Sequence, residues 1–216
     1  SIKAIERLLN ARPQPAPVPT SFLIELLTIA LTQNYFKNQD VFYQQKSGTS
    51  MGAVFPPSLA NIYVDSFEHE FVLVDTNSFR RCITCWKRYI DDIFMIWEGS
   101  VLDLTLFIEY LHRAQPHLKF TSHQSKTSIP FLDLLIKHED QKLYTTIYRK
   151  PTDRNTLLLY KSFHPRSLRD GLPFGQFLRL RRNCARKIDY FQEAEVLKGK
   201  LLARGYPKRL VNRSLK

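Results

Sequence analysis

The ten residues from Arg88 to Trp97, RYIDDIFMIW, constrain the fold of this chain more than any other stretch. Two apolar runs flank the acidic pair Asp91-Asp92, a pattern that predicts a β-hairpin with the carboxylates at its tip. The apolar flanks also predict burial, and two adjacent buried carboxylates are costly unless a cation lies beside them. Because hard oxygen ligands suit Mg²⁺ or Mn²⁺, the hairpin predicts a metal site. A solvated acidic turn is the alternative.

The positive charge of the chain is concentrated in its last third. The chain has 216 residues and a net charge of +12. Residues 1–140 hold 13 Lys and Arg against 15 Asp and Glu, whereas residues 141–216 hold 19 against 5. This asymmetry predicts a polyanionic partner for the last third, with a generic solvated basic surface as the alternative. No apolar run is long enough to span a bilayer, so the sequence predicts no membrane partner.

The cysteines favour free thiols over a metal centre. Cys82 and Cys85 form a Cys-x-x-Cys pair, and Cys184 stands alone. A closed zinc site needs four ligands, usually from two such pairs. We therefore interpret all three as thiols in a reducing compartment, and keep a structural zinc protein built on Cys82 and Cys85 as a further hypothesis.

Apolar periodicity predicts an α+β fold whose strands are not joined in regular βαβ units. The predicted helices cover residues 2–9, 21–34, 58–71, 102–114, 173–182, 189–204 and 207–215. The predicted strands cover residues 41–45, 131–136 and 143–148 and include Phe120, beside the hairpin at 82–97. Pro173 is predicted in the first turn of its helix, Asp189 at an N-cap and Gly205 at a C-cap. The last two helices, joined by Gly-Tyr-Pro, form a helix–turn–helix outline that any helical hairpin would also give.

A loop with glycines at Gly48 and Gly52 precedes the predicted helix at 58–71. Glycine lets another backbone or a ligand approach closely, although a plain loop is the alternative. A helix that begins after such a loop could support a nucleotide or template against the acidic hairpin. Nucleotidyl transfer by two metals requires carboxylates that hold the ions and a wall that positions the base pair.

Five separated blocks of sequence occur in order: QQKSGTSMGAVFPPSLANIYVDSFE, RYIDDIFMIW, FLDLLI, YRKPTDRNTLLLYKSFHP and LRLRRNC. Together they resemble the reverse transcriptases of Penelope-like retroelements, which are relatives of telomerase reverse transcriptase. The tail, from about Ser162 to Leu215, also resembles the helix–turn–helix segment that follows such polymerase domains. The resemblance implies a partial right-hand polymerase palm over residues 1–140. It implies a basic, mostly helical thumb and helix–turn–helix region over residues 141–216.

The resemblance also implies a reaction and its partners. The family copies an RNA template into DNA from a DNA primer, with Mg²⁺ or Mn²⁺ as cofactor. An intracellular, nuclear location follows from such partners.

Individual residues take roles from the same resemblance. Asp91 and Asp92 match the catalytic, metal-binding carboxylates of motif C, and Tyr89 matches the aromatic residue before them. The motif B residues that position nucleotide and template are matched by Gln45, Gly48, Met51, Gly52, Pro57 and Asn61. The segment near the primer grip is matched by Phe131, Leu132 and Asp133. The basic run of Arg179, Arg181 and Arg182 lies where the thumb of such a polymerase would contact the duplex.

One carboxylate of the reverse-transcriptase pattern is missing from this chain. The family takes a third carboxylate from motif A, which we expect upstream of Ser1. None of Glu6, Glu25 and Asp40 lies in an apolar strand that could replace it. The sequence thus predicts a fragment or degenerate copy that does not extend a primer by itself. The alternative is a non-catalytic nucleic-acid-binding helix–turn–helix module derived from such an element.

Overall fold

In the computed structural model the chain divides into two compact units, residues 1–120 and residues 121–216. The structure describes residues 2–13, 17–46, 48–49 and 54–215. The division falls at residue 120, whereas the resemblance implies a boundary at residue 140. The strands before residue 140 belong to a sheet whose last strand is bonded to the loop between two C-terminal helices, through the amide of Ala185 and the carbonyl of Thr145 (2.9 Å).

The first elements of unit 1 have little core of their own. They are α1 (Ile2–Asn10), α2 (Thr20–Thr32), β1 (Tyr35–Asn38) and β2 (Val41–Gln44). None of the described residues in these four elements is buried. β1 and β2 pair antiparallel, and the rings of Phe36 and Tyr43 stack across them with centroids 5.4 Å apart. The sequence predicts β2 but not β1.

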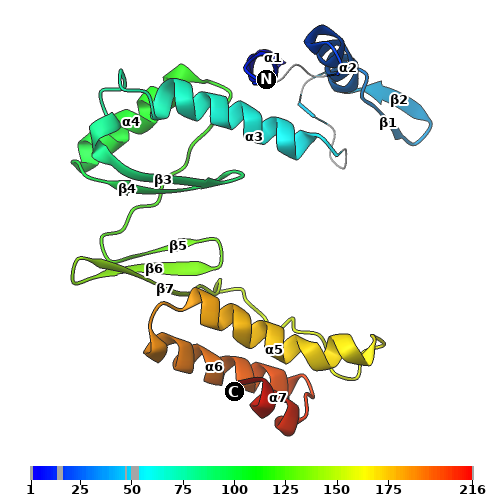
Figure 1. Ribbon diagram of the computed structural model, residues 1–216, viewed down its shortest axis with the longest axis vertical. Helices are drawn as coiled ribbons and strands as arrows, with labels where there is room; N and C mark the ends of the chain where they lie inside the picture. Colours follow the sequence, from blue (N-terminus) through cyan, green and yellow to red (C-terminus); the bar gives the residue numbers. More distant parts are fainter. Residues whose placement is uncertain (1, 14–16, 47, 50–53, 216) are drawn as a thin grey trace. The chain divides into compact units, whose positions relative to one another are not determined.

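The core of unit 1 lies between a hairpin and the helices on one face of it (Figure 1). The elements are α3 (Pro56–Phe67), a π-helical turn (Glu68–Val72), a 3₁₀ turn (Arg80–Cys82), β3 (Ile83–Tyr89), β4 (Asp92–Trp97) and α4 (Val101–Ala114). Phe107 of α4 is almost fully buried and stacks on Trp97 of β4 with centroids 5.4 Å apart. Ser100 and Asp103 form a capping box that fixes the start of α4. The helix predicted at 58–71 is confirmed, although its backbone becomes π-helical at Glu68.

The predicted hairpin forms, with its turn one residue earlier than expected. Tyr89 pairs with Asp92, so the two-residue loop is Ile90-Asp91 and Asp92 is the first residue of β4. This register pairs Trp86 with Met95, and both side chains pack against the core of unit 1. A slip of one residue would turn one of the two strands over and expose its core side chains, so packing fixes the register.

Unit 2 begins with an antiparallel sheet of order β5-β6-β7, formed by β5 (Ser128–Phe131), β6 (Leu134–Glu139) and β7 (Lys142–Ile147). The single strand predicted over residues 131–136 is wrong, because a turn at Leu132-Asp133 divides it between β5 and β6. Leu132 has a φ of 54° in this turn. The fold class is confirmed as α+β with small antiparallel sheets.

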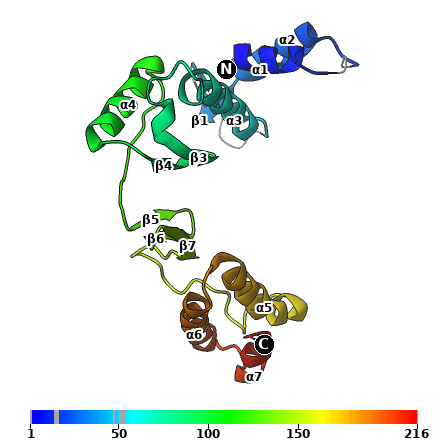
Figure 2. The ribbon, with the colours of Figure 1, turned by 60° about the vertical axis from the view of Figure 1, so that its left-hand side comes forward.

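Three helices complete unit 2: α5 (Arg166–Asn183), α6 (Lys187–Ala203) and α7 (Lys208–Leu215). α5 and α6 lie side by side in both ribbon views (Figures 1 and 2). Their common core includes Phe177 of α5, Leu201 of α6 and Val211 of α7. Val211 and Leu201 are completely buried, so the short α7 is held by its apolar face rather than by its length.

Two of the predicted helix starts are wrong. Pro173 lies inside α5 rather than in its first turn, and its side chain is fully buried. Packing therefore offsets the hydrogen bond that proline removes from a helix interior. Asp189 is not the N-cap of α6, because the helix begins two residues earlier, at Lys187. Its carboxylate instead accepts hydrogen bonds from the Arg186 guanidinium at 2.6 and 3.2 Å.

Gly205 ends α6 in a Schellman motif. The amide of Gly205 donates to the Leu202 carbonyl (2.9 Å), and the amide of Tyr206 donates to the Leu201 carbonyl (3.2 Å). Gly205 has a φ of +82°, which side chains with a Cβ rarely adopt. The predicted C-cap is therefore confirmed, and it sets the four-residue turn between α6 and α7.

Alanine at two glycines of unit 2 should change stability in opposite directions. Gly205→Ala should destabilise unit 2 by about 1 kcal/mol, because alanine is strained at positive φ. Gly199 lies inside α6, where an added methyl group would meet only open space, so Gly199→Ala should stabilise by about 0.5–1 kcal/mol. Thermal unfolding followed by far-ultraviolet circular dichroism measures both. Equal effects of the two variants would contradict the assignment of the turn.

Candidate nucleic-acid interface

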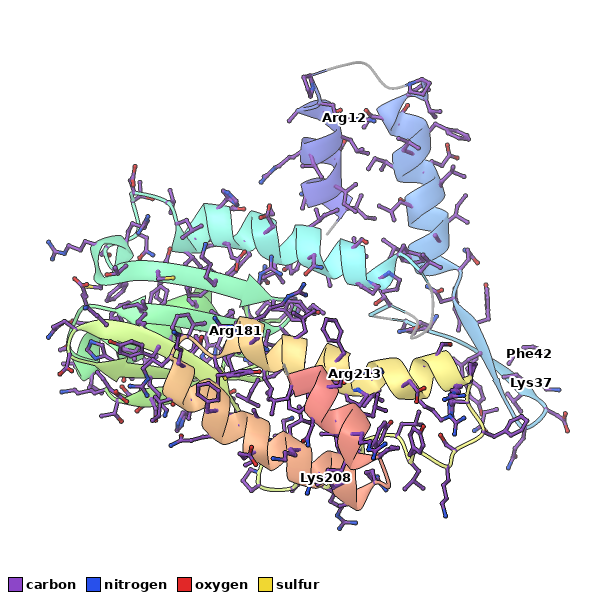
Figure 3. All side chains as sticks on the ribbon, turned by 60° about the horizontal axis from the view of Figure 1, so that its bottom comes forward. Arg12, Lys37, Phe42, Arg181, Lys208 and Arg213 are labelled. Carbon is purple, nitrogen blue, oxygen red and sulfur yellow. The ribbon has the colours of Figure 1, made fainter. Side chains whose placement is uncertain are left out.

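The exposed face of α7 is basic. Lys208, Arg209, Asn212 and Arg213 are exposed, and Figure 3 shows the labelled Lys208 and Arg213 on the outside of this helix. At 100° per residue these four positions lie within an arc of about 140°. The opposite face carries Val211, which is completely buried in the core of unit 2. The amphipathic pattern thus turns three cations and one amide towards solvent together.

The cations on this face, here called the α7 face, are not neutralised by the protein. In the part of the chain that the structure describes, no ion pair involves Lys208, Arg209 or Arg213. The helix itself contains no acidic residue. An ion pair within the chain would have to be broken before a guanidinium could bind an external anion, and the cations of the α7 face would not incur that cost.

The three predicted thumb arginines are all exposed on α5. Arg179 forms an ion pair with Asp133 of the β5–β6 turn, and Arg181 lies over the Tyr190 ring at 5.8 Å from its centroid. At 100° per residue the three positions span an arc of about 160°, with Arg182 between the other two. That Arg179, Arg181 and Arg182 reach one phosphate backbone together stays a prediction.

A charged cluster around Arg186 ties the helices to the sheet of unit 2. Its guanidinium donates to Asp189 and to Glu139 of β6, each at 2.6 Å, and lies 4.7 Å from the centroid of the Tyr144 ring. The hydrogen bond from Arg186 lowers the pKa of the buried Asp189. This carboxylate therefore stabilises the fold above its ordinary pKa, and the stabilisation is lost as pH falls through the lowered value. Arg186 holds α6 in place and is not a free cation.

The acidic hairpin of unit 1 is exposed rather than buried. Asp91 and Asp92 are both exposed, as is Tyr89 beside them, so the expectation of burial from the apolar flanks is wrong. Four side chains of β3 and β4 pack in the core of unit 1 with Phe107 of α4, namely Ile83, Trp86, Met95 and Trp97, and the turn lies outside this core. Ile90 has a φ of 58° at the first position of the loop, an unusual conformation for a β-branched residue. Such local strain is a feature of many functional turns.

Two exposed carboxylates at one turn fit only a loosely held cation. Mg²⁺ is commonly bound by one or two carboxylates while it keeps several waters. The described residues contain no group of three or more His, Cys, Asp or Glu side chains that could hold a metal. Asp91 and Asp92 could therefore hold Mg²⁺ or Mn²⁺ with water, or with an added phosphate, in the remaining positions.

A buried ion pair links α3 to the base of the acidic hairpin. Arg88, next to Tyr89, pairs with Glu68 at 2.8 Å, and both side chains are almost inaccessible to water. Arg88 also donates to the Asn61 side chain at 2.9 Å and to the Ile90 carbonyl at 3.2 Å. Trp86 donates to the same oxygen of Glu68 at 2.6 Å. The network thus brings Asn61 of the predicted motif B to the predicted motif C hairpin.

The remaining motif B residues are more scattered. Gly48 has a φ of +79°, and a Cβ added to it would lie 3.3 Å from Nε2 of the Gln45 side chain. Pro57 lies in the first turn of α3, on the same helix as Asn61. Met51 and Gly52 lie outside the described residues. The Gln45 side chain thus lies close to Gly48, and Asn61 is hydrogen-bonded to Arg88 of the hairpin.

The predicted primer-grip residues lie at the β5–β6 turn of unit 2. Phe131 ends β5, and Leu132 and Asp133 form the two-residue loop before β6. Leu132 and Asp133 are both exposed. Asp133 is the carboxylate that pairs with Arg179, so two of the predicted nucleic-acid contacts bind each other.

The three cysteines are free thiols, as the sequence predicts. Cys82 and Cys85 are partly exposed, and Cys184 is buried. Burial raises the pKa of the Cys184 thiol, which keeps it protonated and unreactive. Within the described residues no further ligand group completes a zinc site at Cys82 and Cys85.

The α7 face could have been found from the sequence. Cations and an amide at 208, 209, 212 and 213 alternate at helical spacing with apolar residues at 210, 211 and 215. The run of arginines on α5 contains as many cations, but a count of charges does not show in which direction each side chain leaves the helix.

Among the helices of the described chain, none is long and apolar enough to cross a membrane.

Comparison with known proteins identifies only the C-terminal helices. No curated protein and no solved structure matches this chain, and nothing in the comparisons supports the reverse-transcriptase resemblance. Residues 156–216 match the family model of the animal helix-turn-helix domain. The match takes in α5, α6 and α7, so the helix–turn–helix tail that the sequence predicts from about Ser162 to Leu215 is confirmed.

Proposed function

We propose that the chain binds nucleic acid through its C-terminal unit, with the α7 face against the phosphate backbone or in a groove of the duplex. The observation that carries this proposal is the set of unpaired cations on the outer face of a helix in a helix–turn–helix match. In proteins with this motif the second helix lies in the major groove, with its first residues at the base edges. An intracellular, nuclear location follows as part of the same proposal.

The chemistry of the α7 face suits both parts of such a contact. Lys208 and Arg213 carry charge that can neutralise phosphates, which supplies most of the affinity without reading sequence. Arg209 and Asn212 are the residue types that bind guanine and adenine edges with paired hydrogen bonds. Unit 2 holds 21 Lys and Arg against 8 Asp and Glu, so its field attracts a polyanion to this face.

Salt dependence tests the proposal. If about five phosphates are neutralised, log K against log salt should slope near −4 for a duplex. Fluorescence anisotropy of the full chain with a labelled DNA duplex and an RNA–DNA hybrid, over several salt concentrations, gives this slope. No binding at low salt, or affinity that does not change with salt, would contradict the proposal.

A second candidate function is part of an RNA-directed DNA polymerase palm. One observation favours it: Arg88 bonds Asn61 of α3 at 2.9 Å and also bonds the Ile90 carbonyl in the acidic turn. A helix held against a carboxylate-bearing hairpin is the arrangement that the resemblance implies. On this reading Asp91 and Asp92 bind metal, and Gln45, Gly48, Pro57 and Asn61 support the nucleotide or template.

Manganese binding tests this second candidate. With only two exposed carboxylates, Mn²⁺ should bind weakly, with a Kd on the order of millimolar, because water fills the other positions. Isothermal titration calorimetry of the full chain and of an Asp91→Asn, Asp92→Asn variant measures the difference. Asp75→Asn together with Glu98→Gln is a matched control at two exposed carboxylates of unit 1 that have no ion-pair partner among the described residues. Equal binding by all three proteins would leave the acidic pair as a solvated turn.

A further inference from the structure

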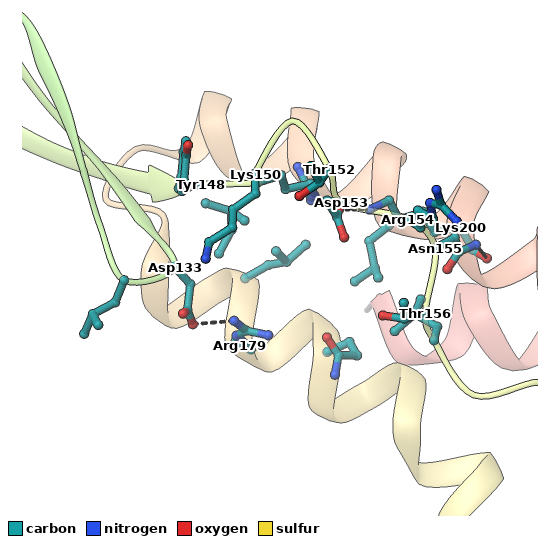
Figure 4. A pocket seen from close by; sticks show the side chains of 17 residues that line it. Asp133, Tyr148, Lys150, Thr152, Asp153, Arg154, Asn155, Thr156, Arg179 and Lys200 are labelled. Carbon is teal, nitrogen blue, oxygen red and sulfur yellow. Dashed lines mark hydrogen bonds and ion pairs between the residues drawn. The ribbon is translucent and has the colours of Figure 1, made fainter. Parts of the chain in front are cut away.

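A cavity of about 400 Å³ lies within unit 2, between the segment that follows β7 and the facing sides of α5 and α6. The segment, residues 148–157, is called the linker here, and the cavity the linker pocket. Five cations and two carboxylates line it: Arg149, Lys150, Arg154, Arg179, Lys200, Asp133 and Asp153. Figure 4 shows Lys150, Asp153 and Thr156 directed into the space between the linker and α5. The lining thus combines apolar side chains, among them Leu157, Leu180 and Leu197, with polar ones and has an excess of positive charge.

The walls of the linker pocket are built before any ligand arrives. The amide of Tyr148 donates to the Asp133 carbonyl at 2.7 Å, which fixes one end of the linker to the sheet. The Asn155 side chain donates to the Lys200 carbonyl at 2.8 Å, and Lys200 bonds the Asp153 carboxylate at 2.6 Å. The linker is therefore anchored at both ends, and a ligand that enters does not have to order it.

Of the five cations that line the linker pocket, three form ion pairs and two have no carboxylate partner among the described residues. Arg149 pairs with Glu193, Lys200 with Asp153, and Arg179 with Asp133. In the described part of the chain, Lys150 and Arg154 have no carboxylate partner, and both are exposed. The pair of Arg179 and Asp133 is about half exposed, so it contributes little and an anion can compete for the guanidinium.

We infer that the linker pocket binds one unpaired nucleotide of a nucleic-acid strand, with phosphate against Lys150 and Arg154. This inference rests on the proposed function and gives the strand a second contact beside the α7 face. A cavity of about 400 Å³ holds a ligand of nucleotide size but excludes a duplex. The hydroxyls of Thr152 and Thr156 and the amide of Gln176 offer hydrogen bonds to a sugar or base.

Calorimetry on the full chain tests the inference with adenosine 3′,5′-bisphosphate, which carries the two phosphates of one internal nucleotide. Lys150→Gln with Arg154→Gln should weaken its binding about tenfold, because each exposed charge contributes up to about 1 kcal/mol. Lys142→Gln with Lys161→Gln removes the same charge at exposed positions of unit 2 outside the pocket, and should change it less than twofold. Equal weakening by the two double variants would overturn the inference, as would absence of binding.

Competition identifies the source of the nucleotide. A single-stranded oligonucleotide of about ten residues should displace the bisphosphate, and inorganic phosphate at the same concentration should not. Binding of the bisphosphate without displacement by the strand would mean a free-nucleotide site and would overturn the inference. If duplex DNA binds with a steep salt slope while the bisphosphate does not bind, the inference about the linker pocket is wrong and the proposed function stands. If no nucleic acid binds, the proposed function itself fails.

Discussion

Replacing Lys208, Arg209 and Arg213 together with alanine should flatten the salt dependence of duplex binding by about 1.8 units of slope. The expected change is about 0.9 for each of the two phosphates, at Lys208 and Arg213, that is no longer neutralised. Near 50 mM salt the same change should weaken binding by about a hundredfold or more. Anisotropy titrations of the full chain, with and without the three substitutions, measure both quantities. The fold should be unaffected, because all three side chains are exposed and have no ion-pair partner among the described residues.

The matched control removes the same charge from other exposed positions of unit 2. Lys126→Gln, Lys142→Gln and Lys161→Gln together lower the net charge equally, at exposed residues outside α7. Long-range attraction should fall in both triple variants, but the slope should change by less than one unit in the control. Equal slopes for the two triple variants would mean that unit 2 attracts nucleic acid only diffusely and that α7 has no special part.

Replacing Arg88 with methionine should destabilise unit 1 by about 3 kcal/mol or more. Methionine keeps much of the side-chain volume but leaves the Glu68 carboxylate buried without its cation, which is the costly way to break a buried ion pair. Urea unfolding followed by tryptophan fluorescence reports on unit 1, because both tryptophans, Trp86 and Trp97, lie there. The midpoint should fall strongly in the single variant.

Two further variants separate the buried pair from other effects of the substitution. Glu68→Gln combined with Arg88→Met should recover part of the stability, since a neutral amide is cheaper to bury than a charge. Arg113→Met removes an arginine from an ion pair with Glu109 whose partners are mostly exposed, and should cost less than about 1 kcal/mol. An Arg88→Met protein as stable as Arg113→Met would contradict the described network.

Elements with a strong local signal can be predicted from the sequence. The hairpin at 82–97 and the helix at 102–114 have apolar residues at strand or helix spacing, and both form. Gly205 is predictable as a C-cap because few other residues tolerate its backbone conformation. The errors arise where packing or pairing outweighs local preference. Pro173 is accepted inside α5 because it is fully buried, and a turn divides residues 131–136 because two strands pair there.

The candidate interface can be predicted in its region but not in its residues. Charge counting predicts a polyanion-binding part in the last third, and the helix-turn-helix match lies there. Arg179 cannot be recognised as an ion-paired side chain, because its partner Asp133 is 46 residues away in the sequence. Likewise, Arg88 pairs with Glu68 through a contact between a helix and a strand that no local pattern reveals. The predicted burial of Asp91 and Asp92 is wrong because a hairpin tip can extend past the core that its strands cover.

Photo-crosslinking of the full chain to a duplex that carries 4-thiothymidine tests most directly whether α7 contacts nucleic acid. Mass spectrometry of the digested adducts identifies the peptides that touch the duplex. We expect adducts on residues 206–215, the peptide that contains α7, and their disappearance in the variant without Lys208, Arg209 and Arg213. Adducts confined to unit 1, or adducts on α7 that persist in that variant, would contradict the proposed interface.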